Sequence, residues 1–305
     1  MNAEENHRPG MDSGLGALEA PARKSAPVLW PLPDARTHVW HRLFWWTFSK
    51  AGRWRRQWIH SHGARAIQLK SLRKIARAYF GESERARLLE RFKDTISTGA
   101  GLTDYYLLHR YVMERKPRRI LELGSGVTTV IMADALRAVS EATGQAGVLE
   151  TLEDIPLYYE HARSLCPDPL NAFVRYHLSP QKSFRWQGQV LCNTYADLPP
   201  GPFDFVFVDG PNAPAGTRPI NGTLLEILAR QDDHPCDAVI DGRRETVLML
   251  GRLVAPGVFG RDYGLNITGL RNVTGRDLRK GISRPILMPP VDLFSFFNIA
   301  RPGAI

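Results

Sequence analysis

The sequence predicts an α/β fold in which a doubly wound, mostly parallel sheet carries helices on both faces and follows an N-terminal helical extension. Short apolar runs alternate with helix-length segments through the second half of the chain, as in folds built from strand-helix-strand units. One apolar run breaks directly into a glycine turn and a helix, and others end in an acidic residue. With 305 residues, 43% of them hydrophobic, the chain can bury such a core and still have residues left at its start.

We expect three parts along the chain: a disordered tail over 1–34, a basic helical extension over 35–100 and a catalytic domain over 101–305. The tail is rich in Pro, Gly, Ala and charged residues and has no periodicity, which is typical of disorder. No apolar segment of the signal-peptide type follows the first residues, so we expect a cytoplasmic protein. No apolar stretch is long enough to predict a membrane span.

The extension holds most of the positive charge of the chain. Residues 35–80 contain eleven lysines and arginines and no Asp or Glu, and because the whole chain carries a net charge of +9, the remainder sums to −2. Helices are predicted over 37–79 and 82–93. Five of the seven tryptophans lie in the same segment: Trp40, Trp45, Trp46, Trp54 and Trp58.

Three roles are open for this basic, Trp-rich segment, residues 35–80. The spacing of Trp54 and Trp58 favours a helical cap that packs on the catalytic domain or on a second copy of the chain. Trp beside Arg also suits peripheral contact with the inner face of a membrane, where rings lie at headgroup depth and cations meet anionic lipid. Nucleic-acid binding through phosphates and stacking comes last. The cap is ranked first because the tryptophans fall around the helix rather than along one stripe.

The turn after residue 123 is the strongest local signal in the chain. A helix is predicted over 102–116, a buried strand over 120–123 and a second helix over 128–139. Between strand and helix, Gly124 and Gly126 let the backbone approach a ligand where a Cβ would clash. The third glycine of a dinucleotide fingerprint is replaced by Thr129, so a pyrophosphate-binding turn is disfavoured.

The next strand, over 147–152, ends at an acid. Ligands of such sheets bind at the carboxyl ends of the strands, and a carboxylate there accepts two hydrogen bonds from a ribose diol. We assign this role to Glu153. Glu150 is the second choice, because strand alternation turns it into the face of the sheet, where a charge without a partner is costly.

Three further strand ends carry polar residues. Ser179 follows a strand over 173–177 and either contacts an adenine or caps its own loop. Asp209 follows a strand over 203–208, and Asp241 follows one over 238–240; each is either a site residue or a turn residue. Antiparallel strands near 266–270 and 286–288 are expected to complete the sheet.

The chain resembles the class I S-adenosylmethionine-dependent methyltransferases. The motif Glu122-Leu123-Gly124-Ser125-Gly126 after a strand, and an acid that closes the next strand, are typical of that family. The strands before Asp209 and Asp241 resemble its fourth and fifth strands, and the match extends over 102–253. The segment Asn193-Thr194-Tyr195 and the acidic turn after the fifth strand resemble a small-molecule O-methyltransferase-like branch.

The resemblance implies a Rossmann-like sheet and S-adenosyl-L-methionine as the cofactor. It also implies methylation of a small-molecule, sugar or lipid-headgroup acceptor, with Asp209 and Asp241 in catalytic roles. Arg243 and Arg244 are expected to orient an acidic acceptor. The cofactor-binding residues that the resemblance assigns are Glu122, Gly124, Ser125, Gly126, Glu153, Ser179 and Asp209.

No metal is expected. Metal-assisted relatives of this branch hold an ion with an acid after strand four and an Asp-Asn pair after strand five, whereas Gly242 stands here in place of the Asn. The three cysteines form no C-x-x-C pair, so neither a zinc site nor a disulfide framework is predicted.

Two other functions compete with methyl transfer. One is a protein that binds S-adenosylmethionine or S-adenosylhomocysteine without turnover and uses its basic segment to bind a membrane or a partner. The other is a nicotinamide oxidoreductase, against which the missing third glycine and Glu122 both count.

Overall fold

The computed structural model describes residues 64–81, 83–93, 95–97, 100–212, 220–262, 264–283, 288 and 291–300. The described residues all belong to one compact unit, Phe44–Ile305. The predicted tail, the start of the predicted helix over 37–79 and the five clustered tryptophans lie outside the described residues.

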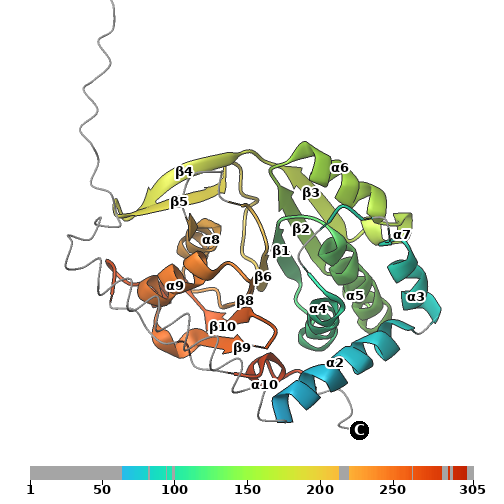
Figure 1. Ribbon diagram of the computed structural model, residues 1–305. Helices are drawn as coiled ribbons and strands as arrows, with labels where there is room; N and C mark the ends of the chain where they lie inside the picture. The colour runs from blue at the N-terminus through green and yellow to red at the C-terminus, as the bar shows by residue number, and fades with distance from the viewer. Residues whose placement is uncertain are drawn as a thin grey trace, which may run out of the picture. The chain divides into compact units, whose positions relative to one another are not determined.

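The centre of the unit is a seven-stranded sheet with the strand order β3-β2-β1-β6-β8-β10-β9 (Figure 1). Neighbouring strands are parallel except β10, which runs antiparallel to both β8 and β9. This mostly parallel sheet with helices on both faces is a Rossmann-like, doubly wound fold, so the predicted fold class is confirmed. The strands are β1 (Arg119–Leu123), β2 (Val148–Glu153), β3 (Val174–Leu178), β6 (Phe205–Val208), β8 (Cys236–Asp241), β9 (Phe259–Asp262) and β10 (Ile267–Val273).

Helices cover both faces of this sheet. In Figure 1, α4 and α5 lie on one face, and α8 and α9 lie on the other. Two short 3-10 helices, η1 (Pro256–Val258) and η2 (Gly275–Asp277), follow α9 and β10. None of the helices within the described ranges combines the length and the apolar character that crossing a membrane requires. The α-helices are α2 (Ala64–Gly81), α3 (Ser83–Glu90), α4 (Leu102–Arg115), α5 (Val127–Thr143), α6 (Pro156–Leu165), α7 (Asp168–Asn171), α8 (Thr223–Gln231), α9 (Arg244–Leu253) and α10 (Leu293–Phe296).

A second, smaller sheet was not predicted. It contains β4 (Gln181–Trp186), β5 (Val190–Tyr195) and β7 (Ile220–Asn221), in the order β4-β5-β7. The sequence did not indicate this sheet, because β4 is polar and half exposed and therefore lacks a buried apolar run. The Asn193-Thr194-Tyr195 segment forms the end of β5, whose last residues are all buried.

The carboxyl-terminal strands differ in part from the expectation. The strand predicted over 266–270 is present as β10, but its antiparallel partner is β9, which was not predicted. Most of the strand predicted over 286–288 lies outside the described residues. In the pairing of β9 with β10, Gly260 lies opposite Gly269. Because neither glycine has a side chain, Val291 and Phe297 pack closely on this pair.

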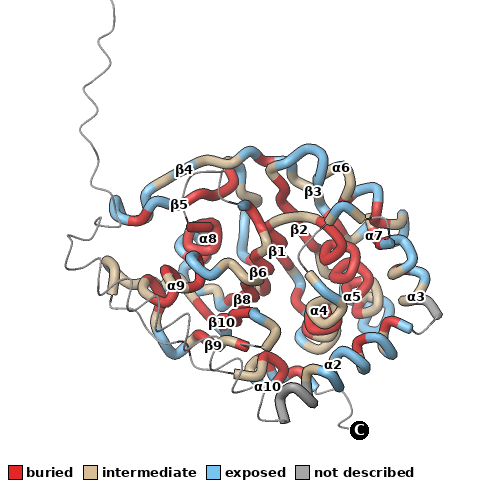
Figure 2. The backbone as a smooth tube through the Cα atoms, viewed as in Figure 1, coloured by how far each residue is buried: buried red, intermediate tan, exposed pale blue. Residues whose placement is uncertain are grey.

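The helix α2 shares the hydrophobic core of the sheet. Ala76 and Phe80 are fully buried and belong to the same apolar cluster as Tyr106 and Ile131 of α4 and α5. Figure 2 shows the resulting buried band, which runs through the strands and through α5. Burial of this apolar surface is the main stabilising contribution to the arrangement.

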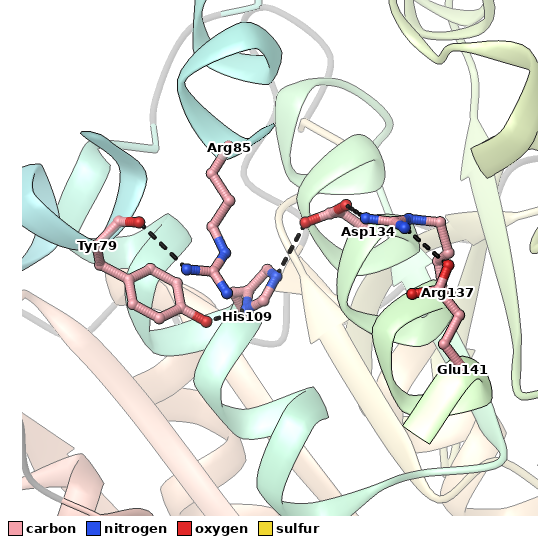
Figure 3. Close-up of polar contacts among 6 residues, drawn as sticks. All are labelled: Tyr79, Arg85, His109, Asp134, Arg137 and Glu141. Carbon is pink, nitrogen blue, oxygen red and sulfur yellow. Dashed lines mark hydrogen bonds and ion pairs between the residues drawn. The ribbon is translucent and has the colours of Figure 1, made fainter. Parts of the chain in front are cut away.

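A chain of polar side chains, buried at His109 and Asp134, also ties α2 to α4 and α5 (Figure 3). The Tyr79 hydroxyl lies 2.8 Å from Nδ1 of His109, and His109 Nε2 lies 3.2 Å from Oδ2 of Asp134. Asp134 accepts a hydrogen bond from Arg137, which also donates to Glu141. The side chain of Arg85 stacks on the ring of Tyr79, 4.0 Å from its centre. We call Tyr79, His109, Asp134, Arg137 and Glu141 the polar chain.

Candidate cofactor and active site

The register of the sheet brings the predicted site residues to one edge. Leu123 at the end of β1 lies opposite Leu152 and Val208, and Val208 lies opposite Ile240. The next residue along each of these strands is therefore at the same level. Those residues are Gly124, Glu153, Asp209 and Asp241, which together form what we call the carboxyl edge.

The backbones after β1 and β6 touch each other at two glycines. Gly124 has φ +92°, a left-handed conformation that favours glycine, and a Cβ added there would lie 2.9 Å from the backbone N of Gly210. A Cβ on Gly210 would lie 2.6 Å from Cα of Gly124 and 2.5 Å from the Tyr195 hydroxyl. Asn221 is buried and donates a hydrogen bond to the carbonyl of Gly210, which fixes this contact from the other side. Neither glycine position has room for a side chain.

The Tyr195 hydroxyl is buried beside this glycine pair. Its oxygen has no hydrogen-bond partner in the structure, although the residue is fully buried. Burial raises the pKa of Tyr195 well above 10, and the nearby Glu153 and Asp154 add to the rise. A buried hydroxyl without a partner costs free energy.

Glu122 lies beneath the turn rather than at its open side. Its side chain is fully buried, and its two oxygens accept hydrogen bonds of 2.5 Å from the hydroxyls of Thr128 and Thr129. Burial raises the pKa of Glu122 to about 7, and the two threonine hydroxyls oppose the rise. The contacts tie the end of β1 to the first turn of α5, so Glu122 holds the turn in place.

Glu153 receives four protein donors. One carboxylate oxygen accepts the Ser125 backbone N–H at 3.0 Å and the Ser125 hydroxyl at 3.2 Å. The other accepts the backbone N–H groups of Asp154 and Ile155, at 3.0 and 3.1 Å. The carboxylate is thus held rigidly against the glycine turn, and burial raises its pKa.

A segment ahead of α4 lies over the same turn. A Cβ on Gly126 would clash with Ser97, so the chain at residues 95–97 passes directly over this glycine. His161 of α6 anchors the segment, since its Nε2 accepts the backbone N–H of Ile96 at 3.2 Å and lies 3.0 Å from the Thr95 hydroxyl. Sequence reasoning did not foresee this crossing, which depends on long-range packing.

Three carboxylates gather beside the turn. The pKa of Asp209 is raised to about 7, mainly by burial; Arg243 opposes the rise, and the charges of Asp241 and Asp104 contribute to it. Burial likewise raises the pKa of Asp104 to about 6, with a contribution from Asp241. Burial also raises the pKa of Asp241. A carboxyl group that titrates near pH 7 is suited to accept a proton at neutral pH.

The two arginines after β8 have different surroundings. Arg243 is mostly buried, and its guanidinium donates to the Pro211 carbonyl at 3.0 Å and reaches Asp209 at 3.5 Å. Its Nε is buried and has no partner in the structure. Arg244 is exposed at the start of α9. Of the two, Arg243 therefore lies at the carboxyl edge.

Two other predicted positions are engaged elsewhere. The Ser179 hydroxyl accepts the backbone N–H of Asp197 at 2.9 Å, as expected for a loop cap. Glu150 lies on the face of the sheet, where it pairs with Arg119 and with His177. Strand alternation places Glu150 on this face, as expected, and these two partners compensate the burial of its charge.

Asp104 was missed at the sequence level. It lies in the first turn of α4, and its carboxylate accepts the backbone N–H of Gly101 at 2.7 Å. The spacing Gly101-Leu102-Thr103-Asp104 before an apolar helix is a capping signal, but it gives no sign that the cap faces Asp209 and Asp241.

The described residues show no metal-binding cluster. No group of three or more His, Cys, Asp or Glu side chains in these ranges is arranged to hold an ion. The cysteines Cys166, Cys192 and Cys236 are buried and free.

Comparison with known proteins gave similarities in structure alone. No protein-family model matches the chain, and no curated protein sequence matches it. A methyltransferase from Geobacter sulfurreducens has 15% identity and a TM-score of 0.40, over 62% of this chain and 87% of that one. A methyltransferase-like protein from Silicibacter pomeroyi has 14% identity and a TM-score of 0.32, over 64% and 92%. The plantazolicin methyltransferase BpumL, solved in complex with SAH, has 13% identity and a TM-score of 0.25, over 58% and 60%. The strand order, rather than these similarities, defines the fold.

Proposed function

We propose that the protein is an S-adenosylmethionine-dependent methyltransferase that methylates an oxygen of a small-molecule acceptor. The observation that carries the proposal is the pairing of the Gly124 turn with Glu153 at the carboxyl edge. A tight backbone turn and an acid on the next strand are what an adenosyl cofactor without phosphates requires. The proposal also rests on the resemblance of the motif from Glu122 to Gly126.

Different residues are proposed to bind different parts of the cofactor. Glu153 would accept the ribose hydroxyls in place of the Ser125 hydroxyl, and Gly124 and Gly126 would allow the close approach of the backbone. The unpartnered Tyr195 hydroxyl supplies a buried donor beside them. Glu122 acts as a positioning residue through Thr128 and Thr129. Ser179 stays a proposed neighbour of the adenine through its loop.

Asp209 is proposed as the general base, with Asp241 beside it. When bound, S-adenosylmethionine supplies a methyl group whose bond to sulfur breaks as its bond to the acceptor oxygen forms, which leaves S-adenosylhomocysteine. Asp209 takes the proton of the acceptor hydroxyl, and its pKa of about 7 suits this transfer. Arg243 holds Asp209 in place at 3.5 Å. The protein otherwise aligns the acceptor and excludes water.

A thermal-shift titration tests the cofactor first. S-adenosylmethionine and S-adenosylhomocysteine should raise the melting temperature of the wild type, since a ligand that binds only the folded state stabilises it. NAD should give no shift. Glu153→Ala should lose the shift, whereas Glu160→Ala, which changes an exposed carboxylate on α6, should keep it.

Turnover separates an enzyme from a binding protein. An enzyme releases S-adenosylhomocysteine when the cofactor is supplied with a hydroxyl acceptor, and Asp209→Asn should reduce that rate about 100-fold at unchanged cofactor affinity. If S-adenosylmethionine binds but no acceptor in a broad panel is methylated, the binding-protein function replaces this proposal. A shift with NAD instead would favour an oxidoreductase.

A further inference from the structure

A cavity of about 330 Å³ lies between α2, the start of α4 and the segment before β10. Leu69 of α2, Leu102 of α4 and Leu265 before β10 form its apolar wall. Arg73, Arg77 and Asp104 supply its charged groups. A volume of this order suits a small organic molecule.

The cavity lies next to the proposed base. Asp104 lines the cavity. It is close enough to Asp209 to raise the pKa of Asp209, and close enough to Asp241 for Asp241 to raise the pKa of Asp104. On the other side, Leu265 precedes Asn266, whose carbonyl accepts the backbone N–H of Gly242 directly after Asp241. The segment that begins at Leu265 is therefore hydrogen-bonded to the turn after β8.

The rim of the cavity is positive. Leu69, Arg73 and Arg77 are spaced by four residues and so lie on one face of α2. Both arginines are exposed, and among the described residues neither is paired with a carboxylate. Asp104 forms no ion pair with either arginine; its carboxylate accepts the backbone N–H of Gly101. Two guanidinium groups on adjacent turns are suited to bind a carboxylate or a phosphate.

We infer that this cavity is the acceptor site and that its ligand is a small organic anion with an apolar body and a hydroxyl group. The anionic group, a carboxylate or a phosphate ester, binds Arg73 and Arg77. The apolar body packs on Leu69 and Leu265, and the hydroxyl faces Asp104 and Asp209. The inference rests on the proposed function and assigns α2 a role in substrate selection that the sequence did not suggest.

Matched probes test the charge preference directly. The full-length protein, saturated with S-adenosylhomocysteine, is titrated calorimetrically with 4-hydroxyphenylacetate, 4-hydroxyphenyl phosphate and the neutral 4-hydroxyphenylacetamide. Both anions should bind about tenfold more tightly than the amide, because the amide cannot form charge-assisted bonds. Arg73→Gln combined with Arg77→Gln should remove this preference.

A charge-matched control uses the same helix. Lys70→Gln combined with Lys74→Gln removes two charges from exposed positions of α2 that do not line the cavity, and it should leave the preference intact. Equal affinities for anion and amide, no binding of either anion, or equal losses in the two double variants would each overturn the inference. Both double variants should still bind S-adenosylhomocysteine, because neither pair of residues lies at the proposed cofactor site. If the wild type itself does not bind S-adenosylhomocysteine, the proposed function is refuted instead.

Discussion

The carboxyl edge and the polar chain both bury ionisable groups, but they treat them in opposite ways. In the polar chain, Asp134 is held between His109 and Arg137, and its pKa is lowered by these partners even though burial opposes the shift. At the carboxyl edge, the one ion pair of Asp209 within the described ranges is a 3.5 Å contact with Arg243, and burial raises the pKa of Asp209 to about 7. The paired charges of the polar chain are typical of a structural contact, whereas buried carboxylates close to one another, with raised pKa values, are typical of a functional site.

The two regions should respond to pH with opposite signs. Burial lowers the pKa of His109, so the stability that its neutral form contributes is complete above its ordinary pKa of 6.5 and is lost as the pH falls. The pKa of Asp209 is raised instead, so the stability linked to its protonated form is present below 3.8 and is lost as the pH rises to about 7.

The largest expected effect is on the glycine contact of the carboxyl edge. Gly210→Ala should lower the free energy of unfolding by about 3 kcal/mol, because the added Cβ meets the backbone of Gly124, which has no room to move. Urea denaturation measures the change. Gly257→Ala is the control, since nothing lies within 4 Å of a Cβ at that position. Equal, small changes in both variants would mean that the two glycines are not in contact.

Breaking the polar chain should cost somewhat less. Asp134→Asn removes the charge that faces His109 and Arg137, and we expect a loss of about 2 kcal/mol in the free energy of unfolding. Glu141→Gln, at the exposed end of the chain, should change stability by less than about 0.5 kcal/mol. If the two variants lose the same amount, the polar chain is not the structural tie described above.

The smallest expected effect on stability is a gain. Asp209→Asn should raise the free energy of unfolding by about 1 kcal/mol at pH 8. The substitution removes a buried charge, and the loss of the contact with Arg243 offsets part of this gain. Since the wild type loses this stability as the pH rises from 3.8 to about 7, the gain should vanish towards acid pH. Denaturation curves across this pH range measure it. A gain that is independent of pH would contradict a raised pKa at Asp209.

The sequence was sufficient for the parallel strands of the central sheet, because their signals are local. The apolar run of β1, the glycines after it and the acids at the ends of β2, β6 and β8 each mark a strand end that can be recognised in the sequence. Parallel pairing then brings those ends to one edge without further information.

Long-range contacts could not be predicted in the same way. Ser97 over Gly126, Asp104 beside Asp241 and Arg77 at the acceptor cavity each join segments that no periodicity relates. The small sheet of β4, β5 and β7 was missed because β4 is polar and half exposed and β7 has only two residues. Arg243 and Arg244 looked equivalent in the sequence. In the structure α9 begins at Arg244, whose side chain is exposed, while the side chain of Arg243 just before it is mostly buried.

The central claim is that the carboxyl edge, and not the polar chain, binds the adenosyl cofactor. Calorimetric titration of S-adenosylhomocysteine into the wild type, Glu153→Ala and Asp134→Asn tests it directly, at a temperature where all three are folded. We predict that Glu153→Ala weakens binding about 100-fold, because a buried diol loses its charged acceptor, while Asp134→Asn binds like the wild type. Unchanged affinity in Glu153→Ala, or an equal loss in Asp134→Asn, would contradict the account.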